Sequence, residues 1–185
     1  MLWLWILIAA LVLIVVIMFV YYFNRFNVLE NRIDNSLSQI DVQLKRRADL
    51  IPNLIESVKG YMKHEKAAIK AVTDARKALV SAKGVEGKIK ANDQLEGVLG
   101  RLFALAENYP DLKANTNFLE LQRELSTTED RIAYARQFYN DSILTYNNLV
   151  ETFPGTFFAG MYGKKEKEFF KIAESERKVV KVDFE

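Results

Sequence analysis

The feature that most constrains this chain is an uncharged, strongly apolar run at its amino terminus. Residues 2–23 carry no charged side chain, and the first charged residue is Arg25. As a helix rising about 1.5 Å per residue, this run is ~33 Å long, enough to cross a bilayer core of ~30 Å. Aromatic residues, which favour the membrane–water interface, lie near both of its ends: Trp3, Trp5, Tyr21 and Tyr22. The sequence therefore predicts a transmembrane anchor over residues 1–24.

Two other interpretations of this run fit the sequence less well. A cleaved signal peptide has a cationic leader, a shorter apolar core and a small-residue cleavage site, whereas Ala9 and Ala10 lie in the middle of this run. A buried helix of a globular core rarely continues this far without a polar residue. The chain also has no cysteine, which excludes a lipid-modified cysteine and disulfide bonds.

Basic residues after the anchor predict its orientation. Only Met1 precedes the run, whereas several basic residues follow it: Arg25, Arg32, Lys45, Arg46 and Arg47. Cytoplasmic flanks carry the excess of Lys and Arg, and acidic residues count for little in this rule. We therefore expect a single-pass protein of the cytoplasmic (inner) membrane, with its amino terminus outside and the remaining chain in the cytoplasm.

The rest of the chain is predicted to be all-α, with three main helices forming an antiparallel bundle. Apolar residues recur every three or four positions along the first helix, as in a coiled coil: Ile33, Leu37, Ile40, Leu44, Arg47, Ile51, Leu54, Val58, Tyr61, Glu65, Ala68, Val72, Ala75 and Leu79. This stripe predicts that the anchor continues with little or no break into one long helix that ends near Gly84. Pro52 lies off the stripe and either bends this helix or begins a new one.

Two shorter helices are expected to follow. Asn92 or Asp93 is expected to cap the first of them, which stops at Pro110. Thr116 or Asn117 is expected to cap the second, which ends at Pro154 and Gly155. The short link at 110–115 allows a hairpin along the first helix or a compact bundle of three or four helices. The predicted domains are thus the anchor, a cytoplasmic bundle over 25–163, and a short carboxy-terminal helix with an extended tail over 164–185.

Charge is divided unevenly between these helices. Residues 24–91 carry 14 Lys and Arg against 8 Asp and Glu, a net of +6, whereas residues 92–153 carry 5 against 10, a net of −5. A basic first helix is therefore expected to pair with acidic later helices, within one chain or between chains.

Five strings, in order along the chain, resemble the LemA family: IDVQLKRRADLIPNL at 40–54, VKGYMKHE at 58–65, ENYPDLKANTNFLELQREL at 107–125, TEDRIAYARQFYND at 128–141 and YNNLVETFPGTFFAGMYG at 146–163. The resemblance covers nearly the whole chain. It implies a bacterial or archaeal membrane protein with its amino terminus outside and a helical domain inside. One branch of the family is associated with building magnetosome membranes, which implies an organising role. The family has no established active site to transfer.

Catalytic and metal-binding patterns are scarce in this sequence. His64 is the only histidine, so a zinc site or a His-based triad would rest on one imidazole. A di-iron bundle needs Glu three residues before each His, and position 61 is Tyr. We expect no enzyme activity, no cofactor, no metal and no nucleic-acid binding. The alternative is a metal-binding or enzymatic bundle that uses His64 and nearby carboxylates.

Two charged residues interrupt the apolar stripe and are candidates for setting the helix register. Arg47 points toward the stripe, and Glu65 either lies buried against a basic partner such as Arg123 or Arg136 or points outward. The cluster of Lys45, Arg46 and Arg47 is expected to pair inside the protein rather than with lipid headgroups.

A glycine-rich turn over 153–163 gathers the candidate interaction residues: Phe153, Phe157, Phe158, Met161 and Tyr162. They are expected to cap the end of their own bundle, with insertion at the membrane interface or docking onto a neighbouring protomer as alternatives. The resulting hypothesis is a membrane-anchored, non-catalytic helical scaffold or interaction module at the cytoplasmic membrane face. It forms a homo-oligomer with parallel anchors and is open to a further membrane-protein partner.

Overall fold

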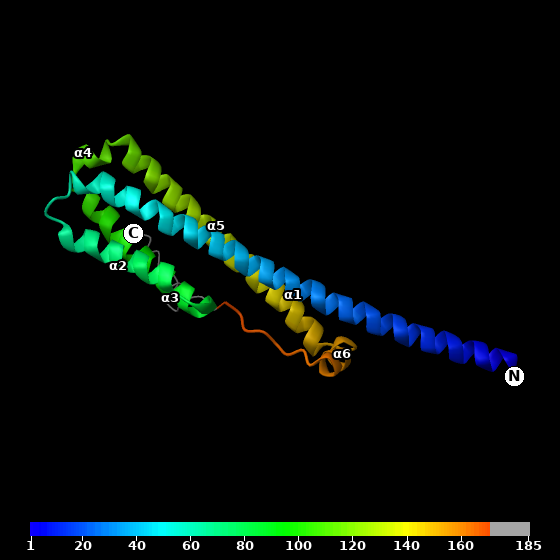
Figure 1. Ribbon diagram of the computed structural model, residues 1–185. Helices are drawn as coiled ribbons and strands as arrows, with labels where there is room; N and C mark the ends of the chain where they lie inside the picture. Colours follow the sequence, from blue (N-terminus) through cyan, green and yellow to red (C-terminus); the bar gives the residue numbers. More distant parts are fainter. Residues whose placement is uncertain (171–185) are drawn as a thin grey trace, which may run out of the picture. The chain divides into compact units, whose positions relative to one another are not determined.

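The computed structural model describes residues 1–170, and these residues are almost entirely helical (Figure 1). The helices in chain order are α1 (Leu2–Lys59), α2 (Lys66–Ser81), α3 (Gly84–Ala106), α4 (Pro110–Lys113), α5 (Thr116–Glu151) and α6 (Gly155–Tyr162). No strand occurs among the described residues. The predicted all-α fold is confirmed.

The chain forms two compact units, which we treat separately. The anchor unit consists of residues 1–30 with the described residues from Asn140 onward, and the bundle unit consists of Asn31–Tyr139. Both α1 and α5 contribute to both units, because each unit boundary falls inside a helix. The anchor unit therefore joins segments from the two ends of the sequence. Each predicted domain is one continuous stretch of sequence and does not describe this arrangement.

Helix α1 continues without interruption through Pro52, so the proline neither ends it nor begins a new helix. Proline has no N–H to donate to the carbonyl four residues earlier, which here is that of Ala48. That carbonyl instead accepts a hydrogen bond of 2.7 Å from Nε of Arg76 on α2. The free-energy cost of the missing helical hydrogen bond at Pro52 is thus partly offset by a hydrogen bond between α1 and α2.

Helix α1 ends much earlier than the apolar stripe predicts. Helix α1 ends at Lys59 and α2 begins at Lys66. In the turn between them, the backbone N–H of Met62 donates to the carbonyl of Val58 at 2.9 Å. Both Val58 and Met62 are fully buried, so the turn itself fills the core. The spacing of three and four continues across the turn because apolar residues on both sides face the same interior.

The bundle unit adopts the compact four-helix alternative, in which consecutive long helices run in opposite directions (Figure 1). Helix α3 begins at Gly84, whose φ of 70° suits a residue without a side chain. This start is eight residues before Asn92, one of the two predicted caps, so that prediction was wrong. Helix α5 begins at Thr116, and its cap is Asn115 rather than Thr116 or Asn117: Oδ1 of Asn115 accepts a 3.1 Å bond from the N–H of Phe118.

The apolar stripe of α1 is buried inside each unit rather than left bare. In the bundle unit its buried members include Ile33, Ile40, Leu44, Ile51 and Leu54. In the anchor unit, Phe26 and Leu29 are buried with Ile143 and Tyr146 of α5. An unpaired stripe on α1 therefore gives no argument for self-association.

The segment after α6 is held by two asparagines seven residues apart on α5. Asn147 exchanges two hydrogen bonds of 2.9 Å with the backbone N–H and carbonyl of Lys167. Asn140 does the same with Phe170, at 2.7 and 3.1 Å. Residues 164–170 have no regular secondary structure, and the rest of the predicted carboxy-terminal helix and tail lies outside the described residues.

Candidate functional site

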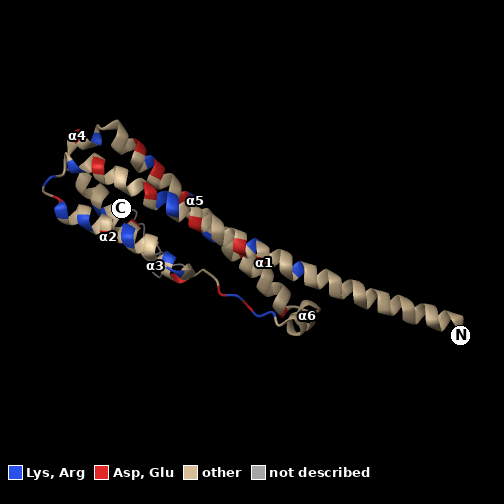
Figure 2. Ribbon diagram, viewed as in Figure 1, with Lys and Arg blue, Asp and Glu red and all other residues tan. Residues whose placement is uncertain are grey.

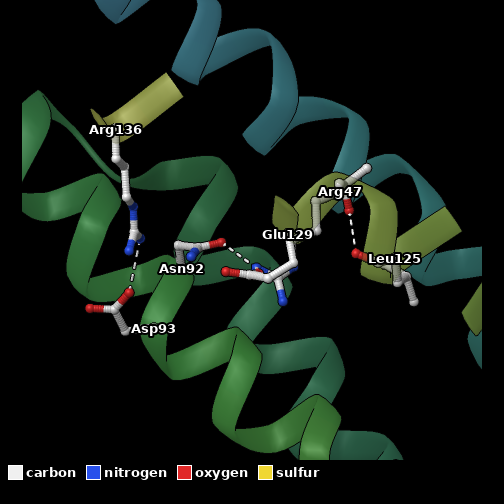
Figure 3. A network of polar contacts seen from close by, with 7 residues as sticks. Arg47, Asn92, Asp93, Leu125, Glu129 and Arg136 are labelled. Atoms are coloured by element: carbon white, nitrogen blue, oxygen red, sulfur yellow. Dashed lines mark hydrogen bonds and ion pairs between the residues drawn. The ribbon is translucent and has the colours of Figure 1, made fainter. Parts of the chain in front are cut away.

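A buried arginine lies at the centre of the bundle unit (Figure 3). Arg47 of α1 is only 3% exposed. Its Nη1 donates a 2.8 Å hydrogen bond to Oδ1 of Asn92 on α3 and pairs with the carboxylate of Glu129 on α5. One guanidinium thereby links three helices, because its planar group carries several N–H donors that point in different directions.

Further ion pairs surround this centre and join the same helices. Arg46 and Glu124 pair at 2.7 Å between α1 and α5, with both side chains nearly half exposed. Arg136 of α5 pairs with Asp93 of α3 at 3.0 Å, as Figure 3 also shows. Two basic residues of α1 thus pair with acidic residues of α5 within one chain. The uneven division of charge along the sequence predicts pairs of this kind. The ion pairs connect α1, α3 and α5 within the bundle unit.

The second charged residue of the stripe, Glu65, has a different setting from Arg47. It lies half-buried in the turn before α2 and accepts a 3.2 Å hydrogen bond from the hydroxyl of Tyr109. Of its two predicted settings, burial against Arg123 or Arg136 was wrong, because the partner of Glu65 is Tyr109. Desolvation and the neighbouring Glu65 carboxylate raise the pKa of Tyr109 above its ordinary value. The structure therefore does not bring Arg47 and Glu65 together.

His64 is exposed in the same turn. Among residues 1–170, no three His, Cys, Asp or Glu side chains are placed to hold a metal ion together. The surroundings of His64 are cationic instead. It lines an open groove of about 1110 Å³ whose charged members are Lys59, Lys63, Lys66, Lys70, Lys77 and Asp74. We call this the lysine groove, and Figure 2 shows its basic residues along α2 and the preceding turn.

A second groove on the bundle unit has the opposite charge. It measures about 560 Å³, and its charged lining residues are Glu56, Glu120 and Glu124. We call it the acidic groove; it runs between α1 and α5. Both grooves border the last turns of α1, the acidic groove through Leu50–Ser57 and the lysine groove through Lys59. The sequence analysis identified neither groove. The lysines at 59, 63, 66, 70 and 77 recur every three, four or seven positions, and this spacing predicts a basic face.

The predicted aromatic turn is a helix in the structure. Helix α6 covers Gly155–Tyr162 and ends at Gly163, whose φ is 65°. Its start approaches α5 so closely that a Cβ on Gly155 would lie 2.1 Å from the carbonyl oxygen of Leu149. Only glycine allows this approach.

Two of the five candidate residues face α1 within the anchor unit. The Phe158 ring stacks on Tyr22, with centroids 4.5 Å apart, and meets Phe19 edge-on at 5.0 Å. Tyr162 lies edge-on to Phe23 at 5.6 Å and donates a 2.9 Å hydrogen bond to the carbonyl of Phe19. These contacts seat α6 on the carboxy-terminal end of the predicted span.

The other three candidate residues are exposed. Phe153 is 86% exposed, and Phe157 and Met161 are each 57% exposed. Phe157 and Met161 are four residues apart and so lie on one face of α6. The structure thus separates the five candidate residues into a pair that packs against α1 and an exposed trio.

A polar cluster completes the anchor unit just beyond the span. Glu30 of α1 accepts a 2.7 Å hydrogen bond from Nζ of Lys164 and a 3.3 Å bond from the hydroxyl of Tyr146. Burial, and then the Glu30 carboxylate, raises the pKa of Tyr146 to about 12. The phenol therefore stays protonated and donating throughout the neutral pH range.

Comparisons with known proteins identify the family of this chain. The LemA family model matches residues 36–184. Protein LemA of Metamycoplasma hominis is 29% identical over 136 residues, which cover 71% of this chain and 62% of the relative. Magnetosome protein MamQ of Magnetospirillum gryphiswaldense is 26% identical over 174 residues, which cover 80% of this chain and 64% of the relative. The chain therefore spans slightly less than two thirds of the length of these curated relatives.

Proposed function

Because this chain belongs to the LemA family, we propose that it is a membrane-anchored, non-catalytic scaffold whose bundle unit assembles copies of the protein side by side. The polar residues inside the bundle unit support the non-catalytic part. Arg47 is occupied by Asn92 and Glu129, so its charge holds helices together. The surface of the bundle unit then performs the binding.

The exposed apolar surface of α1 supports the membrane part of the proposal. Helix α1 is long and apolar enough to cross a bilayer, and none of its most apolar 18-residue window is buried in the structure. Water-exposed apolar surface of this extent is rare on soluble proteins. Figure 2 shows that the amino-terminal part of α1 lacks charged residues up to Arg25.

The proposed orientation has its amino terminus outside and the bundle unit in the cytoplasm. It is tested by introducing one cysteine into this cysteine-free chain. Lys90 is the suitable site because it is exposed, whereas Lys88 is occupied by an ion pair with Asp41. In intact cells, Lys90→Cys is expected to resist an impermeant thiol reagent and to react after lysis. Labelling of intact cells would place the bundle unit outside.

The single observation that carries the assembly proposal is the pair of oppositely charged grooves on one unit. Lys63, Lys66 and Lys70 in the lysine groove have no ion-pair partner among residues 1–170, and neither has Glu120 in the acidic groove. Copies anchored in one membrane share one orientation. Both grooves border the last turns of α1, so the lysine groove of one copy lies at the same distance from the membrane as the acidic groove of its neighbour. The lysine groove of one copy therefore fits the acidic groove of the next.

This contact joins two different surfaces, so it repeats into a ring or an open array rather than stopping at a dimer. Each contact is weak and salt-dependent because exposed ion pairs contribute little individually. Confinement to a membrane raises the local concentration and makes such contacts sufficient. A chain of parallel anchored copies is what an organising scaffold requires.

Charge reversal tests the assembly. We expect Lys66→Glu with Lys70→Glu to abolish cross-linking of full-length protein in native membranes, and Glu120→Lys with Glu124→Lys to do the same. A one-to-one mixture of the two variants is expected to cross-link again into pairs, because the unchanged acidic groove of the first variant then meets the unchanged lysine groove of the second. Lys90→Glu, outside both grooves, is the matched control. Cross-linking that survives both reversals, or fails to return in the mixture, would contradict the proposal.

A further inference from the structure

We propose that α6 is an interfacial helix whose exposed face inserts into the lipid headgroup and upper acyl region beside the anchor. This inference rests on the proposed membrane anchor and adds a second, peripheral membrane contact to it. The partner is a lipid surface.

The depth of α6 follows from its seat on α1. Phe158 lies against Phe19 and Tyr22, which belong to the last turns of the uncharged run. Tyr162 lies against Phe23 and Phe26, with ring centroids 5.6 and 6.2 Å apart. From Phe19 to Phe26 the helix axis advances only about 10 Å. When the run spans a bilayer, α6 must therefore lie at the level where the apolar core meets the headgroups.

The composition of this segment suits that level. Residues 152–163 contain no charged side chain, whereas Glu151 precedes them and Lys164 and Lys165 follow. Phe153, Phe157 and Met161 point away from the protein and are more than half exposed. In water these side chains would remain unburied, whereas an interfacial helix typically buries such a face about 5–10 Å into the boundary region.

The polar groups of the segment are compatible with a low-dielectric surrounding. The hydroxyl of Tyr162 donates to the carbonyl of Phe19, so burial of the phenol leaves no unpaired donor. The exposed cations Arg25 and Lys165 lie just beyond the apolar surfaces of α1 and α6 in the sequence. Long basic side chains at this position reach anionic headgroups.

Position-specific labelling of the full-length protein in phosphatidylcholine–phosphatidylglycerol vesicles tests the inference. The cysteine-free chain accepts a single environment-sensitive fluorophore at Met161→Cys, and a second variant, Phe157→Cys, samples the same face. Both positions are more than half exposed, and the ring contacts of α6 to α1 are made by Phe158 and Tyr162. Lipids brominated near the headgroup end of their acyl chains are the quenchers. We expect a loss of fluorescence at both positions and a blue-shifted emission.

Two control labels separate the possible failures. Val80→Cys, on an exposed position of α2, is expected to show no quenching. Leu11→Cys, in the middle of the run, is expected to be quenched by deeply brominated lipids. Quenching at Leu11 without quenching at Met161 and Phe157 would overturn the interfacial role of α6 alone. Loss of quenching at Leu11 as well would overturn the anchor. A label at Met161 that brominated lipids do not quench, but that self-quenches when every copy is labelled, would assign this face to contact between copies.

Discussion

Replacing Arg47 with alanine is expected to lower the free energy of unfolding by about 3 kcal/mol, the scale of breaking a buried ion pair. The guanidinium is nearly inaccessible to solvent and holds groups on two other helices. Its loss leaves Oδ1 of Asn92 buried without its donor and Glu129 without its cation. For a unit of this size, the midpoint of thermal unfolding is expected to fall by roughly 10 °C or more.

The neighbouring Arg46 provides a matched control. It also pairs with a glutamate of α5, but both side chains of that pair are more than 40% exposed. Arg46→Ala is therefore expected to cost only about 0.5 kcal/mol. Unfolding of both full-length variants in mild detergent, followed by circular dichroism, measures the difference. Equal losses for the two adjacent arginines would contradict a central role for Arg47.

Adding one methyl group at Gly155 is expected to displace α6 from its seat. The new Cβ of Gly155→Ala would lie 2.1 Å from the carbonyl oxygen of Leu149, far inside contact distance. That oxygen belongs to the backbone of α5 and has little freedom to move. Forced overpacking of this kind costs about 2 kcal/mol or more, which exceeds what a short helix can absorb without moving.

Gly160 on the same helix gives the opposite expectation. A Cβ at this position meets nothing within 4 Å, and alanine is favoured over glycine inside a helix by about 0.5–1 kcal/mol. Hydrogen exchange across residues 155–162 distinguishes the two variants. Gly155→Ala is expected to lose protection and Gly160→Ala to keep or gain it. Unchanged protection in Gly155→Ala would show that α6 is not held by this close approach.

The interruption of the first long helix shows where pattern reasoning stops. Spacing of three and four along the chain placed Val58 on the buried stripe correctly, but it also placed Tyr61 there, which is 40% exposed, and it left out Met62, which is fully buried. The same spacing concealed a reversal of direction at residues 60–65, because Met62 in the turn fills the core as a helical residue would. Periodicity reports which residues are buried, and it does not report the direction in which the chain runs between them.

Pro52 is a local signal for the end of a helix, yet α1 continues through it. Its ring leaves the carbonyl of Ala48 without a helical donor, and Arg76 supplies the missing hydrogen bond from α2. Nothing near Pro52 in the sequence identifies Arg76. The outcome depended on a residue of another helix.

The amino-acid sequence by itself determined the uncharged run of span length, the all-α class, the family and the position of Arg47 on a buried stripe. These properties are local, because composition and spacing along one helix decide them. Only the tertiary structure decided the partners of Arg47, the order of the helices in the bundle unit, the two charged grooves and the seat of α6 on α1. Each of these depends on which helix faces meet after folding, and residues such as Phe19 and Phe158 are brought together from distant parts of the chain.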